Sequence, residues 1–414
     1  MSHADHADYC WRELPEYGAR IEHPRLRQPI SLIIDDPMPG YNPAYFHSGF
    51  RFGPARIPVS LVDEFADMIE RTGIRGKFSI VPYPIGLGRV DRAIEGVSDV
   101  ERRYFLDEIR DRIAPHMDIT PEALTHWNAL DLKTGQLLPY WEHVWSRSQT
   151  TETLIPYITL GLEILNNVDI PCRGVTSPWD FGDGVEDAYA TAILEAQRAV
   201  YGRTFAWYFL QMDGSSPSVP PRLSVFDPAK GEAVVSVVTC DSNDFGAAVW
   251  GGGRPNPDAL ISADGQSGRL VETLRNGGSS AFHSHWQTMF SQGTYSGMNA
   301  LELVAQRLET YFGPRIAWTG CDDLARYTAT AAAVQLSAGS DSTGLRLSTP
   351  FACPRFTLSQ AESHPVRDVH VDGKPLTRAA SRAMFDQDSY LVENGRIYAC
   401  WTLEGEQTLS VETA

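Results

Sequence analysis

The chain has 414 residues, of which 43% are hydrophobic and 21% are charged, the proportions of an ordinary globular protein. At this length two or three domains are expected, although a single barrel can take up about 250 residues. The 52 acidic residues outnumber the 35 Lys and Arg residues, and the net charge of −17 argues against nucleic acid and anionic membranes as partners, because both select basic surfaces.

Strand-like and helix-like segments alternate from about residue 28 to about residue 328. The first strand is the apolar run 30–34, and a helix with Leu61, Phe65 and Met68 at helical spacing follows it. Further strands are expected at 77–81, 118–121, 172–176, 204–209, 233–239, 280–283 and 316–318. Seven or eight βα units in succession predict an α/β fold, a parallel barrel over residues 28–328 whose chemistry lies on the loops after the strands.

The pattern changes after Tyr327. Residues 329–344 are rich in Thr, Ala, Ser and Gly and are expected to form a linker, and residues 1–27 form an N-terminal extension. From 345 to 414 short apolar and polar segments alternate, and Asn394-Gly395 between two of them is typical of a hairpin. We expect a small C-terminal β-sandwich-like domain that packs on the barrel or contributes to a substrate groove. An independent sugar-binding module is the alternative.

Membrane and export signals are missing from the sequence. No apolar run approaches the ~18 residues that a membrane span needs, and the N-terminus lacks the basic and apolar pattern of a secretion signal. The six cysteines lie far apart without Cys-x-x-Cys spacing, which is typical of reduced, mostly buried thiols. We therefore expect a cytoplasmic protein.

The most informative motif is Asp35-Asp36, directly after the first strand. Two adjacent carboxylates at the mouth of a core repel each other and need a cation, a shared proton or open solvent. Because successive strand residues point to opposite sides, the two acids should differ in environment, so that one could bind a metal while the other acts as a base. The alternative is a pair of solvated acids in a loop that caps the next element.

Polar residues follow several other predicted strands. They are His126-Trp127-Asn128 with Asp131 nearby, Ser177-Pro178-Trp179-Asp180, Asp241 with Asp244, and His283-Ser284-His285-Trp286. A lone buried histidine is more often a hydrogen-bonded core residue than a ligand. Carboxylates and imidazoles on several strand ends of one barrel face, however, favour a shared metal site.

Three tryptophans, Trp127, Trp179 and Trp286, accompany these polar clusters. Large aromatic faces beside polar groups suit the apolar faces of sugar rings, while each tryptophan alone would more often cap a core. Their common position at predicted strand ends favours a carbohydrate-like ligand, either a small molecule or an oligosaccharide.

The order of these motifs resembles the polysaccharide deacetylase (NodB-like) family of the glycoside hydrolase/deacetylase barrel superfamily, with this chain as a divergent member. The resemblance implies a distorted (β/α)7-8 barrel with one divalent metal. By the family's first motif, matched here by Ile33-Ile34-Asp35-Asp36-Pro37, Asp35 would be the general base and Asp36 a metal ligand. Thr125-His126 matches the first half of the motif that supplies histidine ligands.

The remaining family motifs have looser counterparts. Arg173 with Ser177-Pro178-Trp179 resembles the third motif, and His283 or His285 would be the catalytic acid of the last. The second histidine ligand is absent, because Ala129 and Leu130 occupy its expected spacing. Either Asp131, His285 or another strand-end group completes a modified site, or the metal is lost.

The resemblance implies a metal-dependent hydrolase that removes an acyl group, such as acetyl, from a carbohydrate-like substrate. One divalent ion, Zn²⁺ or else Co²⁺, Ni²⁺ or Mn²⁺, would be held by Asp36 and His126 and would activate water. Asp35 would take the proton of that water, and His285 or His283 would protonate the leaving group. Trp127, Trp179, Trp286 and Arg173 would contact the substrate.

Two other functions stay open at this point. A glycosidase on the same barrel would use two carboxylates about 5–9.5 Å apart, such as Asp35 with Asp180, Asp241 or Asp244. A catalytically inactive sugar-binding barrel would account for the missing second histidine.

Overall fold

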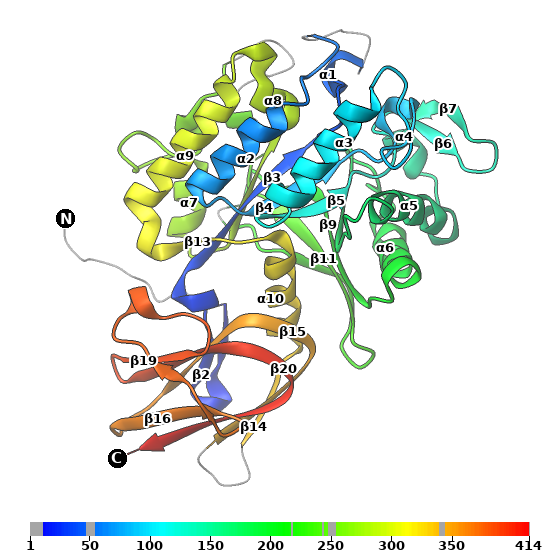
Figure 1. Cartoon of the computed structure of the whole chain (residues 1–414). Helices are drawn as coiled ribbons and strands as arrows, with labels where there is room; N and C mark the ends of the chain where they lie inside the picture. The colour runs from blue at the N-terminus through cyan, green and yellow to red at the C-terminus, as the bar shows by residue number, and fades with distance from the viewer. Residues whose placement is uncertain are drawn as a thin grey trace.

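The computed structural model describes residues 11–46, 54–216, 218–241, 244–246, 254–338 and 344–413. These residues form an α/β part built on parallel strands and, below it in Figure 1, a β part built mainly on antiparallel strands. The mixed α/β class expected from the sequence is confirmed.

The strands of the α/β part that pair around its core lie in two sheets. The first contains β12 (Ser280–His285), β3 (Gln28–Asp35), β4 (Gly76–Ile80) and β5 (Met117–Pro121) in this order, with β13 (Ile316–Trp318) paired to the start of β3. The second contains β8 (Gly174–Thr176), β9 (Phe205–Met212), β11 (Glu232–Thr239) and the antiparallel β10 (Arg222–Asp227). Every strand expected between residues 28 and 328 has a counterpart among them.

Backbone hydrogen bonds join the two sheets at both edges. The Ala123 amide after β5 donates to the Thr176 carbonyl at the end of β8 over 2.8 Å, and the Cys240 amide after β11 donates to the Ala281 carbonyl of β12 over 2.7 Å. In the described chain β3, β4, β5, β8, β9, β11 and β12 therefore follow one another around a ring. Their carboxyl ends lie at the same side of this ring.

Strand β3 is buried along its whole length, as its unbroken Ile and Leu run predicts. Its neighbour β4 starts with Gly76, where an added Cβ would lie 1.8 Å from the Leu32 carbonyl oxygen. Only glycine allows the two strands to approach this closely. The close pairing brings the end of β3 beside the side chains of β4.

Helices cover the outside of these sheets (Figure 1). The longer ones are α2 (Leu61–Thr72), α3 (Asp99–Glu108), α5 (Thr151–Asn166), α6 (Glu186–Tyr201), α7 (Arg269–Arg275), α9 (Ser296–Phe312) and α10 (Cys321–Ala333). Short helices are α1 (Pro43–Phe46), α4 (Glu142–Ser146) and α8 (Trp286–Phe290), and a hairpin of β6 (Asn128–Asp131) and β7 (Gln136–Trp141) precedes α4. Leu61, Phe65 and Met68 of α2 are buried, as their spacing predicts.

The β part is one sheet that contains nine of the described strands. They are β1 (Arg12–Leu14), β2 (Ala19–Ile21), β14 (Gln335–Ala338), β15 (Gly344–Ala361), β16 (Val366–Val371), β17 (Lys374–Pro375), β18 (Thr377–Arg378), β19 (Ser389–Glu393) and β20 (Arg396–Thr413). Asn394 and Gly395 form the tight turn between β19 and β20 with φ of 51° and 70°, so the predicted hairpin is present. The N-terminal strand β2 pairs with β15, so part of the expected N-terminal extension belongs to this sheet.

The segment 329–344 differs from the expected linker. Helix α10 continues to Ala333, and β14 covers Gln335–Ala338. Alanine has a high helix propensity, so the Ala-rich start of the expected linker extends the helix. Residues 1–10 and 339–343 lie outside the described residues. The cysteines of the described chain are free and buried, as expected for reduced thiols. Among the described helices, none combines the length and the apolar character that a bilayer crossing requires.

Candidate active site

The two adjacent aspartates at the end of β3 contact different partners. Both are buried, and Asp36 follows the strand with φ of 74°. Asp35 contacts the Lys77 ammonium and, at 2.9 Å, His283 Nε2, whereas Asp36 Oδ2 accepts a hydrogen bond of 2.6 Å from Gln287 Nε2. Their environments differ, in line with the alternation of side chains along a strand.

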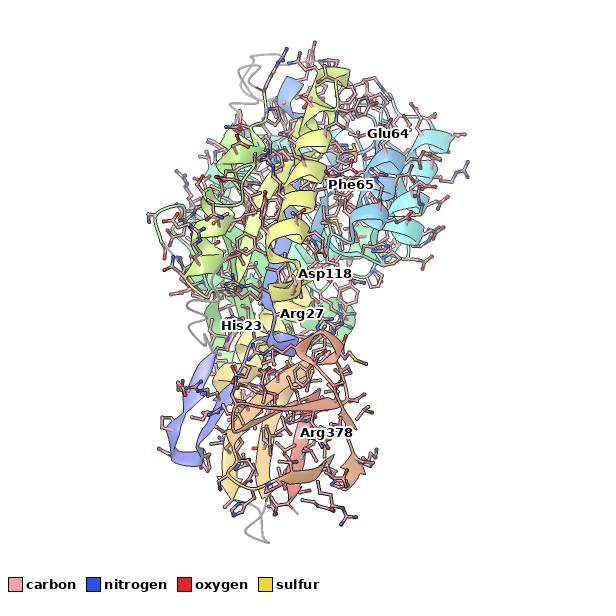
Figure 2. The ribbon with its side chains drawn as sticks, turned by 90° about the vertical axis from the view of Figure 1, so that its left-hand side faces the viewer. His23, Arg27, Glu64, Phe65, Asp118 and Arg378 are labelled. Carbon is pink, nitrogen blue, oxygen red and sulfur yellow. The ribbon has the colours of Figure 1, made fainter. Side chains whose placement is uncertain are left out.

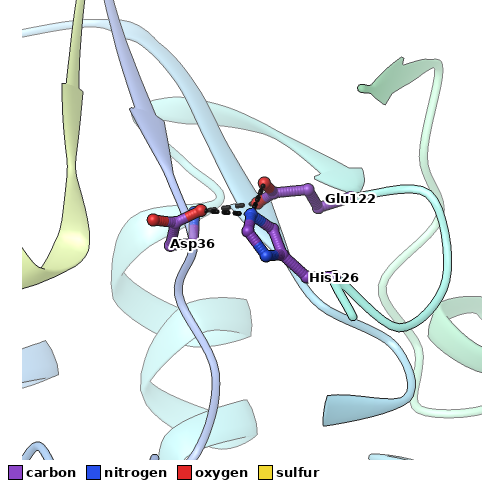
Figure 3. A group of neighbouring side chains, drawn as sticks. All are labelled: Asp36, Glu122 and His126. Atoms are coloured by element: carbon purple, nitrogen blue, oxygen red, sulfur yellow. Dashed lines mark hydrogen bonds and ion pairs between the residues drawn. The ribbon is translucent and has the colours of Figure 1, made fainter. Parts of the chain in front are cut away.

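Asp36 belongs to a buried cluster with Glu122 and His126, which follow β5 (Figure 3). His126 Nε2 lies 2.7 Å from Asp36 Oδ1 and 3.1 Å from Glu122 Oε1. The other oxygen of Glu122 accepts hydrogen bonds from the Asp36 amide (2.8 Å) and the Ser79 hydroxyl (2.6 Å). One ligand atom from each of the three residues lies within 4.8 Å of the other two.

This donor set fits a divalent cation. Two carboxylates and one imidazole are ordinary ligands of Zn²⁺ and of its first-row neighbours. Burial lowers the pKa of His126, but Asp36 and Glu122 outweigh it and hold that pKa well above its usual range. The space between the two carboxylates therefore favours positive charge, which a metal ion supplies in greater measure than a proton.

The backbone of the loop that carries His126 is anchored by the side chain of Glu142, the first residue of α4. Its carboxylate accepts hydrogen bonds from the backbone amides of Leu124 (3.1 Å), Thr125 (2.9 Å) and His126 (2.9 Å). The Tyr157 hydroxyl of α5 donates a fourth, of 2.6 Å. Burial raises the pKa of Glu142 to about 7 in spite of these donors. His126 has φ of 51°, a conformation that this anchoring supports.

Asp35 is held in the charged form by its neighbours. Burial raises its pKa, but the Lys77 ammonium and then His283 outweigh burial and bring the pKa to about 2. Lys77 is completely buried within β4, so its charge has little access to solvent. Asp35 is thus a carboxylate at neutral pH.

The second histidine of β12, His285, pairs with Asp244. Its Nδ1 lies 2.9 Å and 3.0 Å from the two carboxylate oxygens, and the Ser284 hydroxyl donates to the same Asp244 side chain over 3.0 Å. Burial lowers the pKa of His285, but Asp244 outweighs it and raises the pKa to about 10. His285 is therefore an imidazolium at neutral pH, and its ring centre is 4.4 Å from that of His283.

These groups line one cavity of about 550 Å³ at the carboxyl ends of the strands. Its lining includes Asp35, Asp36, Glu122, His126, His283 and His285. At its mouth Trp179 is 49% exposed, stacks on His143 at 5.7 Å and meets the edge of Trp141 at 5.6 Å. Trp127 packs against Trp141 at 5.4 Å, behind this mouth. The cavity joins buried charges to an aromatic rim.

Three residues expected at the site lie elsewhere. Asp131 is at the end of β6, where it accepts a hydrogen bond of 2.8 Å from the Lys133 amide of the hairpin turn. Trp286 is 1% exposed and packs edge-on against Phe65 and Phe78, so it belongs to the core. Arg173 precedes β8, at the opposite end of the strands, with Nε 3.9 Å from Asp322. The expectations for these three residues are wrong.

Sequence reasoning missed Glu122 and Lys77. Glu122 stands four residues before His126, whereas the family motif places the second ligand after that histidine. Lys77 was visible as a charged residue inside a predicted buried strand, which needs a paired charge in the core. Asp244 was noted as a strand-end acid, but its pairing with His285 depends on the fold.

Comparison with known proteins places this geometry in context. No protein-family model matches the chain, and no curated protein is similar to it in sequence. Similar solved structures include a probable polysaccharide deacetylase from Pseudomonas aeruginosa PAO1, with 10% identity, 72% of this chain and 89% of that chain covered, and a TM-score of 0.42.

Two further structures show the same range of similarity. One is described as a glycoside hydrolase/deacetylase from Parabacteroides distasonis, with 10% identity, 80% and 78% of the chains covered and a TM-score of 0.40. The other is a CE4 family pseudoenzyme from Bacillus anthracis, with 9% identity, 70% and 64% covered and a TM-score of 0.33. These structures are described with the family name that the sequence motifs of this chain resemble, and similarity of this size carries no argument by itself.

Proposed function

We propose that this chain is a metal-dependent hydrolase that removes an acyl group, such as acetyl, from a carbohydrate-like substrate. The observation that carries the proposal is the placement of the Asp36–Glu122–His126 cluster, the Asp35 carboxylate and the His285 imidazolium in one cavity. We infer that the two parallel sheets act together as one distorted (β/α) barrel, with this cavity at its catalytic end.

Asp36, Glu122 and His126 would hold the metal, Zn²⁺ in the first place or Co²⁺, Ni²⁺ or Mn²⁺. When bound, the ion supplies Lewis-acid chemistry, which polarises a carbonyl and makes water a stronger nucleophile. Glu122 takes the place that the family resemblance gives to a second histidine. The Ser79 hydroxyl and the Asp36 amide orient its carboxylate.

Asp35 and His285 would move the protons of the reaction. Asp35 stands next to Asp36 in the chain, is ionised, and accepts a proton from water as the water attacks the acyl carbon. His285, protonated and held by Asp244, donates a proton to the leaving oxygen or nitrogen. Lys77 keeps Asp35 charged, and Trp179 offers its exposed face to the sugar.

The pKa values of Asp35 and Asp244 disfavour a glycosidase that uses these two acids as its pair. A two-carboxylate glycosidase needs one carboxyl group that stays protonated near neutral pH. Asp35 has a pKa of about 2, and the pKa of Asp244 is also lowered because His285 outweighs the burial that raises it. Both are therefore carboxylates at neutral pH, and neither can donate the proton.

Metal analysis of purified protein tests the proposal. Elemental analysis of the wild type, after incubation with Zn²⁺ and desalting, should give about one ion per chain. His126→Ala and Glu122→Gln should lose it. Asp131→Asn is the matched control, since Asp131 is an acidic residue of the same loop region outside the cluster, and it should keep the metal.

Acetate release from acetylated oligosaccharides gives the second measurement. The wild type and Asp131→Asn should release acetate, while Asp35→Asn should keep its metal and lose turnover. A folded wild type that stays metal-free after incubation with each of the four ions would sink the proposal. Bound metal and bound sugar without any acetate release would instead identify an inactive sugar-binding protein.

A further inference from the structure

A second, larger cavity lies at the opposite end of β3 from the candidate active site. It has a volume of about 770 Å³ and lies where the α/β part meets the β part. Gln28 at the start of β3, Arg75 before β4 and Arg315 before β13 line it from above, and Arg382 and Tyr398 line it from the β part. The candidate active site is at Asp35, the other end of the same strand, roughly 20 Å away by the rise of an extended chain.

The charge of this second cavity is opposite to that of the chain. Five of its lining residues are arginines and two are glutamates, whereas the whole chain carries a net charge of −17. Glutamates and aspartates elsewhere on the surface cannot neutralise charges inside a concave site as well as a bound anion can. The arginines come from separate segments of the chain, namely Arg25 with Arg27, Arg75, Arg315 and Arg382.

Two of these arginines are paired with acids, and three are not. Arg25 lies 3.5 Å from Asp386, and Arg382 lies 2.6 Å from Glu393. Within the described chain Arg27, Arg75 and Arg315 make no ion pair. Arg27 and Arg75 donate only long hydrogen bonds to backbone carbonyls, of 3.4 Å to Ala383 and 3.5 Å to Pro115, and Arg315 lies over the Phe312 ring. Because carbonyl oxygens and an aromatic ring carry no net negative charge, these contacts do not neutralise the three guanidinium groups.

The turn that enters the cavity is built with strained backbone. Arg25 and Leu26 have φ of 57° and 58°, although neither is glycine, and the Arg25 amide is held by the Thr357 hydroxyl over 2.9 Å. Beside the turn, the buried His23 lines the cavity with Nδ1 unpartnered, while its Nε2 lies 2.7 Å from the Gly277 carbonyl.

We propose that this cavity binds a doubly charged oxyanion, either the phosphate group of a small ligand or a free inorganic phosphate or sulfate ion. Guanidinium groups match the planar pairs of oxygens on such anions and recognise them better than ammonium groups do. A group with two negative charges balances the three uncompensated arginines better than a single carboxylate does. The proposal is independent of the proposed hydrolase activity, because the two cavities share no residue.

Figure 2 shows the place of Arg27 and Arg378, two of the residues that test this site. Arg27 lies where the helical part meets the sheet, and Arg378 lies lower on the sheet, away from the cavity. Arg378 of β18 is exposed and does not line the cavity, so Arg378→Gln removes one positive charge without touching the site. Arg75→Gln is the mildest change at the site, because Arg75 is itself exposed.

The experiment titrates the full chain with sodium phosphate, sodium sulfate or sodium acetate by calorimetry, against sodium chloride at equal ionic strength. Phosphate or sulfate should bind at one site and raise the melting temperature beyond the effect of chloride, and acetate should bind at least tenfold more weakly. Arg27→Gln/Arg315→Gln should weaken binding at least tenfold and Arg75→Gln about threefold, while Arg378→Gln should bind like the wild type.

Several results would overturn the proposal. One such result is that neither phosphate nor sulfate raises the melting temperature beyond the effect of chloride. Another is that acetate binds as tightly as both anions. A third is that Arg75→Gln and the double variant bind phosphate and sulfate like the wild type. The double variant counts only if its circular dichroism spectrum matches that of the wild type, and otherwise Arg75→Gln decides. Because binding is measured without turnover, this outcome is separate from that of the hydrolase assay.

Discussion

The two histidines of β12 contact different carboxylates, and this difference separates their roles. His283 lies against Asp35 beside the metal cluster, and His285 lies against Asp244 on the other side of the cavity. From the sequence either one was a candidate for the catalytic acid. The ion pair with Asp244 favours His285, because it keeps this ring protonated at the pH where a proton must be donated.

Replacing Asp244 with Asn should move the basic limb of the pH–rate profile to lower pH. Asp244 raises the pKa of His285 to about 10, and without this carboxylate only the weaker attraction of Asp36 and Asp35 opposes the burial that lowers the pKa of the ring. The limb should shift by more than two pH units, measured as kcat between pH 6 and 10. Ser284→Ala removes a neutral hydrogen bond to Asp244 and should barely shift the limb.

The same pair should also contribute to stability in a defined pH range. The folded pKa of His285 lies above the ~6.5 of an unfolded histidine. The stabilising contribution is therefore complete below about pH 6.5 and is lost as the pH rises towards 10. An Asp244→Asn variant that kept the wild-type rate profile would remove His285 from the role of acid.

Replacing Lys77 with Met should destabilise the fold by about 3–5 kcal/mol, because it leaves the buried Asp35 carboxylate without its nearest counter-charge. Urea unfolding of the variant measures this loss. The double variant Lys77→Met/Asp35→Asn removes both charges and should recover part of it. Additive losses in the two single variants would mean that the pair is not coupled.

At the scale of elements, helix α4 positions His126, the proposed metal ligand of another segment. Glu142 at its first residue accepts three backbone amides of the loop that ends in His126. The loop is also held through its carbonyls, because Leu124 accepts a hydrogen bond from the Tyr83 amide (2.8 Å) and Thr125 accepts one from the Ile85 amide (2.9 Å), but among these contacts only Glu142 binds the backbone amide of His126. The orientation of His126 therefore depends on a carboxylate that does not itself belong to the cluster.

Replacing Glu142 with Gln should weaken metal binding about 10- to 100-fold, the usual effect of losing a group that orients a ligand. The amide offers one acceptor oxygen where the carboxylate offers two, so part of the loop's backbone loses its partner. Titration with Zn²⁺ and a competing chelator measures the affinity. Tyr157→Phe removes one donor from Glu142 but keeps all three amide contacts, and should change the affinity much less. Equal affinities in Glu142→Gln and the wild type would show that the loop holds His126 without this anchor.

The sequence predicts elements of this fold better than it predicts contacts between them. Strand ends are marked by local signals, so Asp35, Asp36, His126, His283 and His285 were found as a group. Glu122 was not, because its approach to Asp36 depends on how the chain turns after β5 rather than on a spacing shared with known motifs. The prediction for Trp286 was wrong because a tryptophan that begins a helix can face either the cavity or the core. Here its ring packs against Phe65 and Phe78 in the core.

At the scale of the whole molecule, the two ends of the described chain meet in one sheet. β2 pairs with β15, and Trp11 packs against Tyr327 of α10 at 4.9 Å. Ile21 of β2 is fully buried opposite Leu358. The composition of residues 11–27 gave no sign of this pairing, since three-residue strands are too short to show a periodic pattern.

Replacing Ile21 with Ala should cost about 2–5 kcal/mol, because it opens a cavity in the core of the β part. The midpoint of urea unfolding, followed by tryptophan fluorescence, measures the loss. Glu13→Ala on the same hairpin removes an exposed side chain paired with Arg20 and should change stability by less than about 1 kcal/mol. Wild-type stability in Ile21→Ala would show that the hairpin does not support the sheet.

This closure of the sheet by the first strands has a consequence for biosynthesis. β1 and β2 leave the ribosome before the other described strands, but β15, the partner of β2, is translated more than 300 residues later. At about 5–20 residues per second the early hairpin waits some 15 seconds or longer with its edge unpaired. The α/β part can mature in that interval, while the β part can assemble only after β15 to β20 have emerged. Nascent chains that stall before residue 344 should therefore present the hairpin to chaperones or to other chains.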